Sequence, residues 1–464
     1  MWRKLTKDKF VLGCVEGYKI PFLNKPKQNI VKFKSKSDSH EVKKAIDSFL
    51  EKGVIKRCKE SRRQYVSPYF LTLKPDGTNR FILNLKRLNK FVQSFHFKYE
   101  DLKTATKLIG TGCYMITLDI KDAFLLVPVH KSSQKYLRFR FQEKCYQFQC
   151  LPFGLSTSPY VFTKILKPVL KYLRKRGFIS SIYLDDILCI ANSPDESLRN
   201  AQATSSLLKS LGFILNDKKS SSTPNTMCKF LGFLIDSRKS DLSLTNTKKE
   251  KLISLLETFL KKKSVSIIDL ARIIGKLIAA CPAVKYGWLY TKRLESEKIA
   301  ALESSNGSYK GKTCITLEAK NDILWWIKNI STAKKSFKTL EFNIVINTGA
   351  SDFGWAATDG TREICGCWNR SDIVYHINFK ELLAVKLALV ELGKNVRDCN
   401  ILLRVDNTTA IAYINRMGGV KYKNYNDLAR IIWQWAEVRN IWLRASYIAS
   451  SDNNDADRLC TFSR

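Results

Sequence analysis

The sequence predicts an α+β fold divided into about three domains. The chain has 464 residues, 45% of them hydrophobic, which is enough for several ordinary cores. Strand-like and helix-like segments alternate up to about residue 240, and mainly helical spacing follows up to about residue 294. A new series of strands followed by helices starts at Phe342, which indicates a separate C-terminal domain.

The first 38 residues predict a basic, extended N-terminal arm (1–38). Their polarity is irregular, and Pro21 and Pro26 interrupt any regular element. A helix is then expected from residue 39, because Val42 and Ile46 have helical spacing, and Gly53 is expected to end it.

A β-hairpin is predicted next. Residues 69–74 and 80–85 have strand composition and flank the turn sequence Pro-Asp-Gly-Thr at 75–78. The hairpin is basic, which suits a flap over phosphate groups.

The remaining elements follow from their periodicity and their turn residues. We expect strands ending at 119, within 136–148 and at 229–235, helices at 158–176 and 196–211, further helices over 247–294, and a linker at 306–311.

Adjacent carboxylates inside an apolar run are the most informative feature of the sequence. Asp185 and Asp186 lie within the run 182–188, where burying them costs several kcal/mol unless cations neutralise them. Asp119 ends a second apolar strand upstream. If the two strands are neighbours, the three acids form an oxygen-rich cluster suited to paired Mg²⁺ ions, which serve phosphoryl transfer. A solvent-exposed turn is the structural alternative.

The charge of the chain indicates a polyanionic partner. Lys and Arg number 79 against 42 Asp and Glu, which gives a net charge of +37. Nucleic acid is the expected partner, with a membrane surface or simple solubility as alternatives.

No membrane span or secretion signal is expected. No segment approaches the ~20 apolar residues of a membrane span, and the N-terminal residues lack a secretory apolar core. The 13 cysteines lack metal-site spacing and are interpreted as reduced core residues. An intracellular location is therefore expected, with nucleus or cytoplasm left open.

Two motifs carry a family resemblance that covers nearly the whole chain. Leu-Pro-x-Gly at 151–154 and Tyr-x-Asp-Asp at 183–186 follow the Asp119 strand in that order. The chain thereby resembles the reverse transcriptase and ribonuclease H region of retrotransposon polyproteins. The amino-acid sequences at 151–156, 406–410 and 456–459 are most similar to those of DIRS-type elements, which also encode a tyrosine recombinase.

The resemblance implies a right-hand polymerase of fingers, palm and thumb followed by a ribonuclease H-like α/β domain. After the N-terminal arm, it implies fingers and palm at 39–240, a helical thumb and linker at 241–310, a connection at 311–341 and the ribonuclease H-like domain at 342–464.

The resemblance also assigns site residues. Asp119 and Asp185 would hold two Mg²⁺ ions, with Mn²⁺ as an alternative ion and with Asp186 beside them. Lys219 matches a lysine proposed to protonate pyrophosphate, although the adjacent Lys218 leaves the register open. Residues 230–233 resemble a primer-grip hairpin, with a plain core strand as the alternative. The nucleotide-binding positions are Lys74, Arg80, Phe124 as the gate under the sugar, Phe153 and Gly154.

The C-terminal domain departs from its relatives at one acid. Glu381, Asp406 and Asp457 match three of the four ribonuclease H carboxylates, but Gly349 stands at the first position. Asp352 lies three positions further on, about 10 Å along a strand and facing the other way. The segment 447–450 also departs from the family pattern. We therefore expect little or no RNA cleavage.

The function expected from these observations is RNA-directed DNA polymerisation. The expected partners are an RNA template, a DNA primer, an RNA–DNA hybrid and deoxynucleoside triphosphates, and no membrane. A retroelement remnant that binds nucleic acid without turnover is the main alternative, and a template-independent nucleotidyltransferase is another. The sequence leaves the oligomeric state, host and priming mode open.

Overall fold

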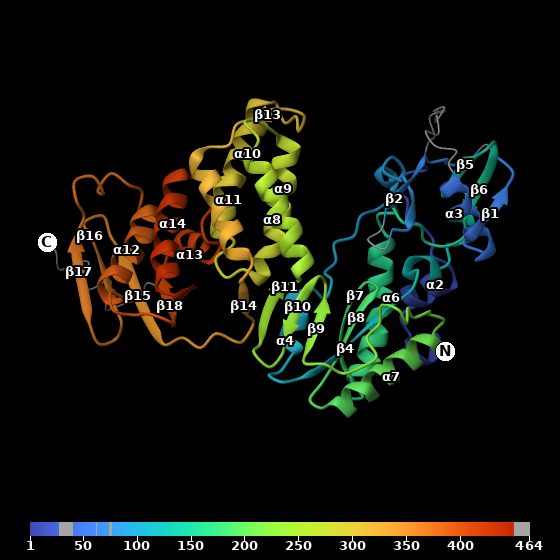
Figure 1. The fold of residues 1–464 in the computed structure, drawn as a ribbon, viewed down its shortest axis with the longest axis horizontal. Coiled ribbons are helices and arrows are strands. Elements are labelled where there is room, and N and C mark those ends of the chain that lie inside the picture. The colour runs from blue at the N-terminus through green and yellow to red at the C-terminus, as the bar shows by residue number, and fades with distance from the viewer. Residues whose placement is uncertain (27–39, 62, 74–76, 450–464) are drawn as a thin grey trace. The chain divides into compact units, whose positions relative to one another are not determined.

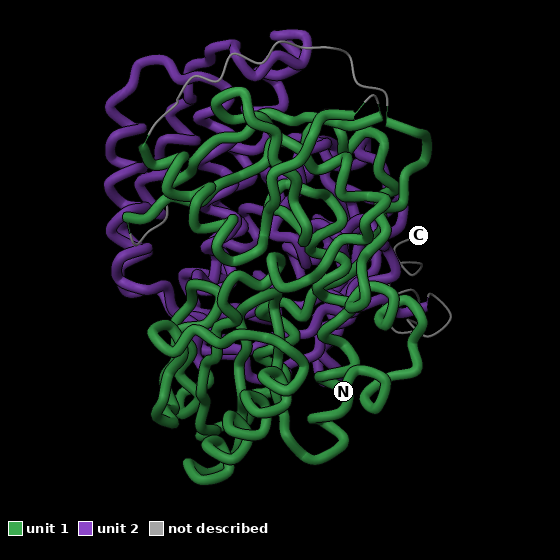
Figure 2. Tube along the Cα trace, turned by 90° about the vertical axis from the view of Figure 1, so that its right-hand side faces the viewer, with its two compact units in different colours: residues 1–240 green, residues 241–464 purple. Residues whose placement is uncertain are grey.

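The structure is a computed structural model that describes residues 1–26, 40–61, 63–73 and 77–449. It divides into two compact units, 1–240 and 241–464, and each is described by itself (Figure 1, Figure 2). Two predicted site residues, Lys74 and Asp457, lie outside the described residues.

The N-terminal segment of unit 1 is mainly helical over residues 2–17, so the expected extended arm is wrong there, whereas residues 18–26 contain no helix. Helices α1 (Trp2–Leu5) and α2 (Lys9–Gly17) both contact α6 (Ser158–Arg174). The Asp8 side chain caps α2 by accepting hydrogen bonds from the amides of Phe10 and Val11. Val11 and Cys14 are buried, and this burial outweighs the basic, irregular composition of the segment.

Two small sheets and a helix form the part of unit 1 expected to be the fingers. Helix α3 (His40–Glu51) and the hairpin of β2 (Tyr69–Leu73) and β3 (Asn79–Leu83) confirm the predicted elements. Strands β1 (Ile55–Cys58), β6 (Lys144–Phe148) and β5 (Arg138–Phe141) pair antiparallel in that order. Their core is aromatic: Phe81, Phe139 and Phe148 lie with ring centroids 5.1–6.3 Å apart.

The sheet that carries the predicted acids has the antiparallel order β4–β8–β7. These strands are β4 (Tyr114–Asp119), β8 (Asp186–Ala191) and β7 (Ile179–Tyr183). Helices α4 (Leu102–Leu108), α6 and α7 (Pro194–Ser210) pack against them, as Figure 1 shows in green and cyan. The strand residues Ile116, Ile187 and Cys189 join the main buried core of unit 1.

The segment expected as a single strand at 229–235 is instead a hairpin. Strands β9 (Met227–Phe230) and β10 (Phe233–Asp236) pair antiparallel, with Phe230 opposite Phe233. Leu231 (φ 49°) and Gly232 (φ 77°) both adopt the left-handed backbone, as in a tight two-residue hairpin turn. The plain-strand alternative is therefore wrong, because the tight turn reverses the chain.

Unit 2 begins with four long helices: α8 (Asn246–Leu260), α9 (Ile267–Ala280), α10 (Lys292–Ser304) and α11 (Leu317–Ile330). The expected linker at 306–311 is packed within this unit. There the Ile267 amide donates to the Gly311 carbonyl at 2.9 Å, and β12 (Val265–Ser266) pairs with β13 (Lys312–Thr313). The glycines therefore form a tight turn between helices and not a domain boundary.

The C-terminal part of unit 2 contains a five-stranded sheet, with the order β17–β16–β15–β18–β19. Strands β15 and β18 are parallel, as are β18 and β19, while β16 and β17 continue antiparallel. Helices α12 (Ile377–Leu392), α13 (Thr408–Asn415) and α14 (Lys423–Val438) complete this α/β domain. The strand bounds are β15 (Ile344–Ala350), β16 (Gly354–Thr358), β17 (Glu363–Cys367), β18 (Asn400–Val405) and β19 (Trp442–Tyr447).

Short elements fill the connections. They are η1 (Leu88–Phe91), η2 (Ala123–Leu126) and α5 (Lys131–Gln134) in unit 1, and β11 (Asp241–Leu244), η3 (Cys281–Ala283), η4 (Leu289–Thr291) and β14 (Lys334–Ser336) in unit 2. Across the described ranges, no helix combines the length and apolar character needed to cross a membrane.

Candidate active site

Strand pairing brings the three predicted acids of unit 1 together. In the antiparallel register of β4 and β8, Asp119 lies directly opposite Asp186. The turn between β7 and β8 carries Asp185, whose carbonyl accepts a hydrogen bond of 2.9 Å from the Ile120 amide. Leu184 in this turn has a φ of 55°, a backbone conformation unfavourable for a branched residue. The acids are thus fixed by the backbone.

A loop beyond the sheet holds the Asp119 side chain, which is largely buried (8% exposed). The Asn216 amide donates to its Oδ1 at 2.9 Å, and the Asp119 backbone amide donates to Ser220 Oγ at 3.1 Å. Lys219 Nζ lies 4.0 Å from Asp119 Oδ2, while the lysine side chain remains mostly exposed. The sequence interpretation missed Asn216 and Ser220, although both flank the predicted Lys219.

The carboxylates at this site are held in an unfavourable electrostatic environment. Burial, and to a smaller extent the charges of Asp185 and Asp119, raise the pKa of Asp186 from 3.8 to about 6. Burial is also the main cause of the raised pKa of Asp185. Lys219 opposes both shifts, and Arg80 opposes that of Asp185. Acids clustered in this way favour the binding of either protons or cations.

The side chains of this site do not have the arrangement of a formed metal-binding site. Within the described part of the chain, no group of three or more His, Cys, Asp or Glu side chains has the arrangement needed to hold a metal ion. The donor chemistry nevertheless suits divalent cations, because three carboxylates meet and the charge of Asp119 helps to raise the pKa values of Asp185 and Asp186. Asn216 donates a hydrogen bond to Oδ1 of Asp119, which leaves Oδ2 of this carboxylate for a cation.

Gly154 fits its place for a structural reason that the sequence did not reveal. Its φ is +108°, and a Cβ atom there would lie 2.2 Å from the Leu83 carbonyl oxygen on β3. Asn89 fixes the same loop from η1, because its side chain donates to the Gly154 carbonyl (2.9 Å) and accepts from the Ser156 amide (3.1 Å). Asn89 was not predicted as a site residue, because it lies outside the sequence motifs at 151–154 and 183–186.

Three of the predicted nucleotide-binding residues form one contact group. The rings of Phe124 and Phe153 meet edge to face with centroids 5.5 Å apart. The exposed Arg80 places its guanidinium 5.0 Å from the Phe153 ring centroid, which is within cation–π range. Phe124 is also anchored on Phe162 of α6, at 5.7 Å. The fourth residue, Gly154, directly follows Phe153.

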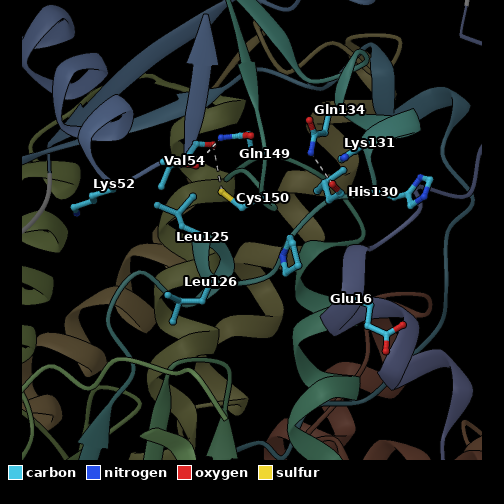
Figure 3. A pocket seen from close by; sticks show the side chains of 13 residues that line it. Glu16, Lys52, Val54, Leu125, Leu126, His130, Lys131, Gln134, Gln149 and Cys150 are labelled. Atoms are coloured by element: carbon cyan, nitrogen blue, oxygen red, sulfur yellow. Dashed lines mark hydrogen bonds between the residues drawn. The ribbon is translucent and has the colours of Figure 1, made fainter. Parts of the chain in front are cut away.

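A cavity of about 540 Å³ lies elsewhere in unit 1, and none of the predicted site residues lines it (Figure 3). Leu125 and Leu126, which follow Phe124, form part of its wall, and Cys150 precedes the 151–154 motif. Glu16, Lys52, His130, Lys131 and Gln149 contribute polar groups. The acids therefore lie outside this cavity.

In unit 2, two of the predicted ribonuclease H acids are described. Glu381 on α12 is buried (3% exposed), and Asp406 follows the last residue of β18. Gly349 lies on β15 at the neighbouring register position, since Thr348 pairs with Val405. Asp352 points away: its side chain is 84% exposed and its Oδ1 lies 3.3 Å from Lys380 Nζ. Asp352 is thus exposed to solvent, whereas Glu381 is buried.

Comparison with known proteins agrees with this geometry. Residues 72–235 match the family described as "Reverse transcriptase (RNA-dependent DNA polymerase)". The "Enzymatic polyprotein" of figwort mosaic virus (strain DxS) is 25% identical over 419 residues, covering 83% of this chain and 57% of that protein. The "Enzymatic polyprotein" of cauliflower mosaic virus (strain Strasbourg) is 24% identical, covering 92% of this chain and 61% of that protein. The "Transposon Tf2-3 polyprotein" of Schizosaccharomyces pombe is 26% identical over 204 residues, covering 44% of this chain and 14% of that protein.

The solved structures show the same fold. The foamy viral protease-reverse transcriptase dRH in complex with double-stranded DNA superposes with a TM-score of 0.58 at 19% identity, covering 94% of this chain and 73% of that chain. The same viral enzyme in complex with an RNA/DNA hybrid gives 0.56 at 19% identity, covering 94% of this chain and 56% of that chain.

Residues 72–235 thus resemble the reverse transcriptase domain of retroelement polyproteins, and the predicted polymerase fold is confirmed. The chain spans about 60% of the two viral polyproteins. The DIRS-type placement stays a prediction.

Comparing alanine variants at Gly154 and Gly177 should separate the cost of backbone strain from the cost of a steric clash. Gly154→Ala is expected to lower the free energy of unfolding by roughly 2–3 kcal/mol, because positive φ and a clash with Leu83 add together. Gly177→Ala is the matched control: Gly177 also has positive φ (+82°) but has open space around it, so a loss of about 1 kcal/mol is expected. Equal losses in denaturant unfolding would contradict the clash.

Neutralising Asp186 should stabilise the protein in metal-free buffer. Its pKa is raised from 3.8 to about 6, so wild-type stability falls as pH rises through that window. Asp186→Asn should therefore raise the free energy of unfolding at pH 7.5 by on the order of 1–2 kcal/mol after solvent screening. The gain should disappear below about pH 4, where the carboxyl is protonated in both states. Exposed Asp217→Asn is the control, and an unchanged or less stable Asp186→Asn protein at pH 7.5 would contradict the electrostatic account.

Proposed function

We propose that this protein is an RNA-directed DNA polymerase that adds deoxynucleotides to a primer 3′-hydroxyl. The observation that supports it most is the register of β4 and β8, which places Asp119 opposite Asp186 with Asp185 in the adjoining turn. This arrangement lies inside the segment that matches the reverse transcriptase family. Since phosphoryl transfer depends mainly on positioning and charge stabilisation, a rigid carboxylate site is its central requirement.

In this proposal Asp119 and Asp185 hold two Mg²⁺ ions, or Mn²⁺ ions in their place, with Asp186 beside them. When bound, the ions supply charge stabilisation to the attacking and leaving oxygens. The protein contributes the proton chemistry: Lys219, 4.0 Å from Asp119, is close enough to the acids to donate a proton to the leaving pyrophosphate. Asn216 keeps Asp119 oriented until the cations bind.

The contact group of Arg80, Phe153 and Phe124 would bind the incoming nucleotide. Arg80 is exposed and suited to two phosphate oxygens at once, and stacking on Phe153 limits its freedom before substrate arrives. Phe124, packed against Phe153 and Phe162, would form a firm wall that clashes with a ribose 2′-hydroxyl. Lys74 is assigned to the triphosphate by resemblance alone.

An RNA template, a DNA primer and their hybrid are the partners proposed for this chain. The net charge of +37 provides long-range attraction for such polyanions. Solved structures of similar fold are described as complexes with double-stranded DNA and with an RNA/DNA hybrid. We also propose an intracellular location, since the twelve cysteines in the described ranges are free thiols.

The ribonuclease H-like domain is proposed to be inactive or strongly impaired. Gly349 supplies no carboxylate where the first acid is expected, and Asp352 pairs with Lys380 at the surface. Glu381, Asp406 and Asp457 would then leave a two-metal site one carboxylate short.

Primer extension tests the polymerase proposal. Purified protein should extend a DNA primer on an RNA template in Mg²⁺, with the product sequence following the template. Asp185→Asn should reduce the rate by at least about a thousandfold, since it removes a metal ligand. Asp195→Asn, an exposed acid in the first turn of α7, should have little effect.

The two alternatives predict different results. A non-catalytic remnant would bind the primer–template without making product. A template-independent transferase would extend primers with no regard to template sequence.

A hybrid-cleavage assay tests the proposed loss of nuclease activity. Wild-type protein should leave the RNA strand of an RNA–DNA hybrid intact in Mg²⁺ or Mn²⁺, and Gly349→Asp should restore measurable cleavage by supplying the missing carboxylate. Cleavage by the wild-type protein that disappears in Glu381→Gln would overturn this part of the proposal.

A further inference from the structure

A buried ion pair joins the helical region of unit 2 to its C-terminal α/β domain. Asp322 on α11 has no exposed surface, and Arg430 on α14 donates to both of its carboxylate oxygens, one at 3.2 Å. Arg293 on α10 lies 3.9 Å from the same carboxylate. Burial raises the pKa of Asp322, and Arg430 is the main opposing influence.

Aromatic rings surround this ion pair and extend the contact. Tyr290 of η4 stacks on Trp325 of α11 with centroids 3.9 Å apart and planes at 12°. The Arg430 guanidinium lies 4.9 Å from the Tyr290 ring centroid. Glu437 lies seven residues after Arg430 on α14. It accepts hydrogen bonds from the Tyr290 hydroxyl and from Trp325 Nε1, the latter at 2.9 Å.

A second group of contacts lies where α14 leads into β19. The Tyr286 hydroxyl donates to the Ile441 carbonyl at 2.9 Å, and Lys285 Nζ donates to Asn440 Oδ1 at 2.6 Å. The Tyr286 ring also lies 6.2 Å from the ring of Trp433. One face of α14 and the turn that follows it are therefore covered by the segment 285–330.

Such an interface couples the two parts energetically. A buried carboxylate that loses its cationic partner is left with an uncompensated charge, which is strongly destabilising. The helices and the α/β domain cannot separate from each other without exposing Asp322, Arg430 and the stacked aromatic rings to solvent. The contact is continuous with a hydrogen-bonded network, so its members act together.

We propose that the C-terminal domain acts as a structural support that fixes the helices of residues 246–330 through α14, independently of any nuclease chemistry. This role needs Arg430 and Glu437 but not the missing carboxylate at Gly349. It explains why the five-stranded fold is complete although one of the four expected carboxylates is replaced by Gly349. The inference concerns folding within unit 2 and holds whether or not the chain polymerises DNA.

Hydrogen exchange of the full chain, followed by mass spectrometry of peptides, tests this support. Arg430→Met should accelerate amide exchange at least tenfold both in α14 and in α10 and α11, because the helices lose their anchor. Arg444→Met, at an exposed position on β19, is the matched control and should change neither. Tyr290→Phe, a milder change that removes one hydroxyl, should accelerate exchange on both sides to a smaller extent.

Charge rescue distinguishes the ion pair from general damage. Combining Asp322→Leu with Arg430→Met removes both charges and should restore most of the protection lost in the single variant. Acceleration confined to residues 342–449 in both Arg430→Met and Tyr290→Phe would overturn the proposal, as would full protection of α11 in both variants.

Discussion

The antiparallel pairing of β4 with β8 is the constraint on which the site depends. It places Asp119 beside Asp186, and the short turn after β7 leaves Asp185 next to both. Because side chains alternate along a strand, a one-residue slip would turn Asp119 away from Asp186 and reverse the buried faces of Ile116 and Leu118. Burial of the sheet core therefore fixes the position of the acids.

This arrangement has an electrostatic cost that the surrounding residues reduce only in part. Asn216 and Lys219 interact with Asp119, while Asp185 and Asp186 keep raised pKa values. A site so placed is poorly stabilised alone and gains most from divalent cations. Unit 2 presents the opposite case, in which Arg430 of the C-terminal domain directly balances the buried Asp322 of α11. The first group of carboxylates is thus only partly compensated by neighbouring charges, whereas Asp322 is paired within a packed interface.

Much of the fold was predictable because its signals are local. Helical spacing in α3 and α6, the turn chemistry between β2 and β3, and the Tyr-x-Asp-Asp hairpin all depend on neighbouring residues. The N-terminal helices were missed because tertiary burial of Val11 is not evident in sequence, whereas the β9–β10 hairpin was implied by the family resemblance and not by strand periodicity. Asn89, Asn216 and the Leu83 approach to Gly154 were missed for a related reason, since each depends on contacts between distant segments.

The central claim, that Asp119, Asp185 and Asp186 share divalent cations, is tested most directly by localised radical cleavage. Fe²⁺ bound in place of Mg²⁺, with ascorbate and peroxide, should cut the backbone near residue 119 and near residues 185–186 in the same sample. Excess Mg²⁺ should suppress both cuts, and Asp185→Asn should abolish them. Cleavage at only one of these segments, or at neither, would contradict the account.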